Sequence, residues 1–85
     1  MSQELPPATF EVIISTFATQ AAVALGQVAN PITNEITEDL EQAKFAIDLL
    51  AVLEEKTKGN REDNEESLLT DVLYNLRMIY IDKKG

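Results

Sequence analysis

Residues 8–25 form an apolar segment whose spacing constrains the fold more than any other part of the chain. Apolar side chains recur there every three or four residues, which predicts a helix buried along one stripe; they are Phe10, Ile13, Ile14, Phe17, Ala21 and Leu25. Pro6 and Pro7 suit the first turn of a helix and Gly26 suits its end, so the sequence predicts a helix over about 8–25. Further apolar residues cover most of the circumference of this helix. Packing against two neighbouring helices requires only one apolar stripe, so the apolar surface is wider than a three-helix unit would bury.

A second helix is predicted after the Asn-Pro dipeptide at residues 30–31, which marks a loop because the residue before a proline avoids the α region. This helix is expected over about 37–56. Thr37 is its expected N-cap, and Gly59 suits the left-handed position beyond its last turn. Apolar residues lie on two of its faces, so most of the helix is expected to be buried.

A third helix is predicted over about 64–81, where Asp63 and Glu66 resemble a capping box at its start. No segment shows the alternation of apolar and polar residues that is typical of a strand. A chain of 85 residues has room for one core. We therefore expect an all-α, three-helix unit that forms a single domain over residues 1–85.

The charge and the missing residue types exclude several classes of function. The chain carries fifteen acidic and seven basic side chains, a net charge of −8, and no Cys or His. Because the bases are scattered and the acids repel phosphate, no nucleic acid partner is expected. The common catalytic triads and His-containing metal sites cannot be built, so no cofactor is expected. Residues 1–7 lack the basic region of a signal peptide, so a cytoplasmic protein is expected. The absence of Cys is compatible with that compartment.

A family resemblance extends over nearly the whole chain and is carried by five blocks of sequence. They are Leu5-Pro6-Pro7-Ala8-Thr9-Phe10, Ala18-Thr19-Gln20-Ala21 with Leu25-Gly26, Asp39-Leu40-Glu41-Gln42-Ala43-Lys44 with Ile47-Asp48-Leu49-Leu50, Leu53-Glu54-Glu55-Lys56-Thr57-Lys58-Gly59-Asn60, and Leu73-Tyr74-Asn75-Leu76-Arg77. They closely resemble a small bacterial family catalogued as domain of unknown function 1844. The resemblance implies a small helical bacterial protein and supplies no activity, cofactor or site. Residues 27–36 depart from it, because the family carries a more polar turn there.

The broad apolar surface of the first helix indicates that a second copy of the chain covers part of it. Alanines let another helix approach closely, and closed two-fold dimers are the commonest soluble oligomers. We expect a helical homodimer whose interface uses one stripe of this helix: Phe10, Ile14, Phe17, Ala18, Ala21 and Leu25. The function expected is that of a non-enzymatic interaction or structural protein. A membrane span is disfavoured, because Ser15, Thr16 and Thr19 lie in the middle of the segment. In a helix, such hydroxyls usually bond back to a carbonyl of the preceding turn.

Two alternatives come from other classes of protein. All-α nucleotide pyrophosphohydrolases hold Mg²⁺ between paired carboxylates on neighbouring helices, and the pairs Glu38 with Glu41 and Glu62 with Glu65 match that spacing. Acids near helix starts also have a capping role, which favours the structural interpretation. The second alternative is a carrier of an apolar ligand that binds along the first helix.

Two surface features are given structural roles. Lys44 and Asp48, one turn apart on the second helix, are expected to form an exposed ion pair. Tyr74 and Arg77 on the third helix belong to residue types enriched at protein contacts.

Overall fold

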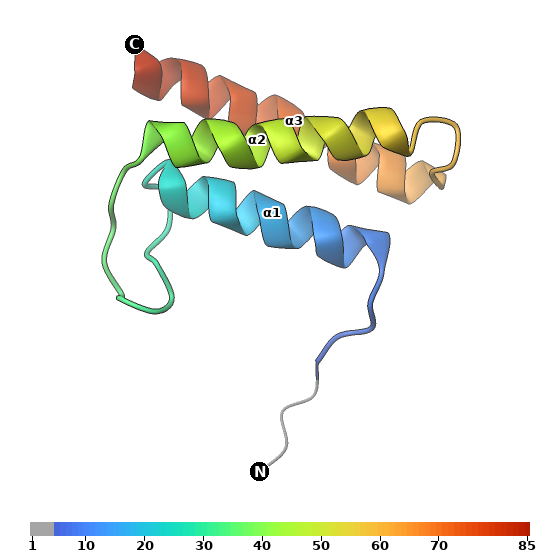
Figure 1. The fold of residues 1–85 in the computed structure, drawn as a ribbon, viewed down its shortest axis with the longest axis horizontal. Helices are drawn as coiled ribbons and strands as arrows, with labels where there is room; N and C mark the ends of the chain where they lie inside the picture. Colours follow the sequence, from blue (N-terminus) through green and yellow to red (C-terminus); the bar gives the residue numbers. More distant parts are fainter. Residues whose placement is uncertain (1–4) are drawn as a thin grey trace.

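The computed structural model describes residues 5–85, and its regular structure is entirely helical over that range. It contains α1 (Phe10–Ala24), α2 (Leu40–Lys56) and α3 (Asp63–Lys84). In Figure 1, α2 runs in the opposite direction to α1 and α3. The prediction of an all-α, three-helix unit is confirmed for this range. Residues 1–4, which belong to the predicted domain and to the segment searched for a signal peptide, lie outside the described residues.

The first two helices begin at side-chain caps. The Val12 N–H donates to the hydroxyl of Thr9 at 3.2 Å, and the Gln42 N–H donates to the carboxylate of Asp39 at 3.2 Å. The prediction of Thr37 as the second cap is therefore wrong by two residues. The Asp39 N–H also donates to the Ala24 carbonyl at 2.7 Å, so a contact with the end of α1 sets where α2 begins.

The cap of α3 lies one residue before the predicted one. The Glu62 N–H donates to the carboxylate of Glu65 at 2.8 Å, and the Glu62 side chain accepts in return from the N3 main chain. This reciprocal pair satisfies N–H groups that have no partner within the helix. At its other end α3 continues to Lys84, past the predicted end at residue 81. Lys83 and Lys84 then lie in the last turn, where the helix dipole favours cations.

The end of α1 is a left-handed glycine turn. Gly26 has φ of +75°, its N–H donates to the Val23 carbonyl at 3.0 Å, and the Gln27 N–H donates to the Ala22 carbonyl at 2.9 Å. Two carbonyls of the last helical turn are satisfied in this way. The predicted role of Gly26 is confirmed. Gly59 is also left-handed, but it lies two residues beyond Thr57, which caps α2.

Ten aliphatic side chains form the core, and all three helices contribute to it. They are Ile14, Ala21, Leu25, Ala43, Ala46, Ile47, Leu50, Leu69, Leu73 and Leu76. Burial of α2 is less complete than expected, because Phe45 is 61 % exposed and Val52 is 53 % exposed. Both residues lie about half a helical turn away from Ile47, on the outer side of α2.

Polar contacts at both ends of the bundle hold the helices together. Asn64 at the start of α3 donates to the carboxylate of Glu11 at the start of α1, over 2.8 Å. At the other end, the ammonium of Lys83 lies 3.3 Å from the carboxylate of Glu38, just before α2. These contacts agree with parallel α1 and α3 and an antiparallel α2 (Figure 1). The molecule is flat, with extents of 42 × 35 × 16 Å.

Candidate protein-interaction groove

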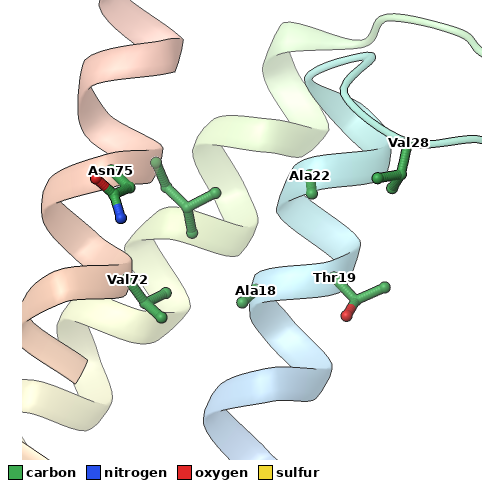
Figure 2. A pocket seen from close by; sticks show the side chains of 7 residues that line it. Ala18, Thr19, Ala22, Val28, Val72 and Asn75 are labelled. Carbon is green, nitrogen blue, oxygen red and sulfur yellow. The ribbon is translucent and has the colours of Figure 1, made fainter. Parts of the chain in front are cut away.

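A shallow groove runs between α1 and α3, and Figure 2 shows α2 behind it. Its volume is about 360 Å³. Val72, Asn75 and Leu76 of α3 form one wall, Ala18, Thr19 and Ala22 of α1 form the other, and Val28 of the following loop lies at one end. Among residues 5–85, no charged side chain lines the groove. Its chemistry is therefore suited to another apolar, uncharged surface.

The groove exists because α1 presents small side chains on the side where it faces α3. Ala18 and Ala22 are four residues apart and lie on the same face of the helix. Ser15, an exposed residue one turn earlier, continues that face. Side chains of this size leave open the space that two larger residues would fill. The two helices meet in the buried core, which contains Ile14 and Ala21 of α1 and Leu69, Leu73 and Leu76 of α3.

Three of the six residues predicted to form a dimer interface lie instead in the core of the single chain. Ile14, Ala21 and Leu25 are each 0 % exposed. Their side chains pack against α2 and α3, so the prediction is corrected at these positions: they are not available to a partner. Phe10, Phe17 and Ala18 are partly buried against the same core. Among the six, Ala18 lines the groove.

The hydroxyl groups of α1 have separate roles. Thr16 donates to the main-chain carbonyl of Val12 at 2.8 Å, which confirms the expected bond to the preceding turn. Thr19 lines the groove. The predicted interface includes Ala18, and Ala22 is among the alanines expected to let another helix approach. Val72, Asn75 and Leu76 were not expected at that contact. The spacing of α1 placed Ala22 beside its apolar stripe, whereas the α3 wall depends on how the helices pack.

The four carboxylates of the magnesium alternative do not form one site. Glu38 and Glu41 lie at the start of α2, whereas Glu62 and Glu65 lie at the start of α3, at the opposite end of the bundle. Since α3 has 22 residues, about 33 Å separates its two ends. Glu62 and Glu65 also cap α3. Across residues 5–85 no three acidic side chains are grouped so that they could hold a metal ion, and the four-carboxylate site is therefore a wrong prediction.

The predicted ion pair on α2 is present. The ammonium of Lys44 lies 2.8 Å from the carboxylate of Asp48, and both side chains are more than half exposed. This hydrogen bond, together with the charge of Asp48, raises the pKa of Lys44 above its ordinary value of 10.5. The pair borders a smaller groove between α2 and α3, with a volume of about 270 Å³, that Arg77 and Tyr80 also line. Tyr74 is 64 % exposed, and its predicted role in a protein contact stays a prediction.

A family model matches this chain. The model of a family described as "Domain of unknown function (DUF1844)" matches residues 7–82. Neither the curated proteins nor the solved structures include a significant match. Within the part of the chain that the structure describes, no helix is both long enough and apolar enough to cross a membrane.

Proposed function

This chain belongs to the family described as domain of unknown function 1844, and we propose that it is a non-enzymatic helical interaction protein that self-associates through the exposed, uncharged face of α1. The family description carries no activity. The proposal therefore rests on the surface of the chain. We also propose that the chain acts in the cytoplasm, with which the absence of Cys is compatible.

The distribution of charge carries the proposal. The chain has a net charge of −8, yet residues 12–34, which cover nearly all of α1 and the start of the next loop, contain no charged side chain. Two copies of an acidic protein repel each other wherever their charged surfaces meet. Contact between copies is least opposed where both surfaces are uncharged. The exposed face of α1 and the groove beside it form such a surface.

The small core gives a second reason for association. The side chains that are fully buried are aliphatic, and all three Phe residues remain partly or largely exposed. A domain of this size buries about 60–65 % of the surface that its unfolded chain exposes, and its stability is correspondingly marginal. With no Cys in the chain, disulfide bonds cannot add to it. A second copy adds buried apolar area without any change in sequence.

Mass in solution, measured by size exclusion with light scattering, tests this proposal. We expect the wild type to have twice the mass of one chain. Ser15→Glu, which adds a charge to the exposed face of α1, should be a folded monomer. Ser67→Glu is the matched control, because Ser67 is an exposed helical serine on α3 that lies away from the groove. It should remain a dimer.

A wild-type monomer would contradict self-association. Loss of the dimer in both Glu variants would show that added charge alone dissociates the copies, without assigning the interface to α1. Native mass spectrometry of the same samples distinguishes self-association from the carrier alternative, since a bound apolar ligand would add mass to each chain. Circular dichroism confirms that each variant keeps its helices.

A further inference from the structure

We propose that the groove between α1 and α3 receives helix α1 of a second copy of this chain, in antiparallel orientation. This inference rests on the proposed function and extends it to a defined arrangement of helices. The occupant is a helix, because the walls of the groove are the helices α1 and α3. These two helices run nearly parallel (Figure 1), and helices pack side by side in a bundle. The occupant is α1, because this helix offers an uncharged face to an uncharged groove.

The charges of the chain favour a second copy over an unrelated basic partner. A basic protein would be drawn to the acidic side chains, and residues 12–34 contain none of them. The groove walls present alanine, valine and leucine with the uncharged Thr19 and Asn75. The face of α1 that borders the groove has the same character, with Ser15, Ala18 and Ala22. Surface and groove therefore match in charge and in polarity.

The directions of the helices favour the antiparallel orientation. Both walls run the same way, since the starts of α1 and α3 are joined by the 2.8 Å hydrogen bond between Asn64 and Glu11. An antiparallel occupant sets its own dipole against the dipoles of both walls. A parallel occupant would also bring the two Glu11 carboxylates to the same end of the assembly. The antiparallel arrangement keeps these charges at opposite ends.

A two-fold axis makes the contact reciprocal. The α1 helix of each copy fills the groove of the other, so α1 and α3 of both copies surround a shared second core. Ser15 and Ala22 are equally distant from a point between Ala18 and Thr19. With the axis at that point, Ser15 lies opposite Ala22 of the partner subunit.

The absence of native Cys makes disulfide mapping a direct test. Ser15→Cys and Ala22→Cys proteins are each labelled with a different isotope, mixed in equal amounts and oxidised gently. Residues 15 and 22 are seven positions apart, or about 10 Å along the helix, so the two orientations give different disulfides. We expect the mixed disulfide between the two variants to form in large excess over either homodimeric disulfide. Val52→Cys, on the outer side of α2, is the control and should cross-link only slowly.

Each other outcome overturns a defined part of the proposal. Excess of the two homodimeric disulfides would show parallel α1 helices, which overturns the antiparallel inference and leaves self-association through α1 intact. Fast cross-linking only in Val52→Cys would place the interface on α2. A wild type that is monomeric by light scattering removes the proposed function itself. To test that the groove is filled, Ala22→Phe should lower the fraction of dimer at least tenfold while Ser67→Phe does not.

Discussion

The guanidinium of Arg61 donates a hydrogen bond of 2.6 Å to the main-chain carbonyl of Glu54, in the last turns of α2. It also donates to the hydroxyl of Thr57 at 3.1 Å and to the carboxylate of Glu66 in α3 at 3.2 Å. The side chain is 9 % exposed. The last carbonyls of a helix have no hydrogen-bond partner within it. Arg61 provides a partner for one of them in α2 and also joins α2 to α3.

Replacing Arg61 should therefore destabilise the connection between α2 and α3. We expect Arg61→Ala to lower the free energy of unfolding by about 2 kcal/mol, since it removes these bonds and a buried aliphatic stem. Arg61→Lys should recover only part of the loss, because one ammonium cannot replace the forked donors. Urea denaturation monitored by circular dichroism measures both. An alanine variant as stable as wild type would contradict this role.

Truncation in the core should be costly, and the same kind of change on the outer side of α2 should not be. Leu50 is fully buried and Val52 is 53 % exposed. We expect Leu50→Ala to destabilise the chain by about 3 kcal/mol, through lost burial and the cavity that remains. Val52→Ala should change stability by less than about 0.5 kcal/mol in the absence of a partner. Equal losses in the two variants would mean that the core is wrongly placed.

The two internal glycines with positive φ form a matched pair. A Cβ on Gly26 would lie 3.4 Å from the carbonyl oxygen of Thr37, whereas a Cβ on Gly59 would have no other atom within 4 Å. Alanine in the left-handed region costs about 1–2 kcal/mol at either position. We expect Gly26→Ala to be the more destabilising, because the turn at Gly26 lies against Thr37 and Glu38 and has less room to relax than the open turn at Gly59. Thermal unfolding of both variants gives the difference, and a larger effect at Gly59 would be the contrary result.

The pKa of Lys44 should respond to its partner. The hydrogen bond to Asp48 and the charge of Asp48 raise this pKa above 10.5. The raised value means that the stability from the pair is fully present below pH 10.5 and is lost as the pH rises through the folded-state pKa. We expect Asp48→Asn to lower the pKa of Lys44 toward its ordinary value. Detection of the ammonium by NMR during a pH titration measures it, and an unchanged pKa would exclude the pair in solution.

Salt should strengthen self-association. Two copies with a net charge of −8 repel each other, and the proposed interface contains no ion pair that salt would weaken. Raising the salt concentration from about 0.01 M to about 1 M shortens the Debye length from about 30 Å to about 3 Å, which screens the repulsion. We expect dimer affinity to rise several-fold in sedimentation equilibrium. A fall in affinity would indicate an interface held by opposite charges.

The helices and most of the core were predictable from local patterns. Apolar spacing identified Ile14, Ala21 and Leu25 as members of a buried stripe, and the structure buries all three. The start of α2 was not predictable, because the bond between Asp39 and Ala24 joins residues fifteen positions apart. Local capping preference cannot distinguish Thr37 from Asp39 when a distant carbonyl selects one of them.

The groove was only partly predictable, for a related reason. Ile14, Ala21 and Leu25 were expected to face a partner, and they are buried in the core of the single chain instead. A stripe shows that a residue is buried but does not show which surface buries it. What remains for an outside partner is the next face around the helix, where Ala18 and Ala22 lie. The alanines of that face were identifiable from the sequence, but the opposite wall of the groove becomes visible only once α3 is placed.

The hydrogen bond from Asp39 to Ala24 also joins the two ends of the loop between α1 and α2. The two ends of the loop are held together whatever lies between them, and its tip at Ile32 is 91 % exposed. Doubling the length of such a loop costs only about 0.6 kcal/mol in closure entropy. We therefore expect the tip to tolerate insertion of an epitope or a reporter domain while the helices stay in place.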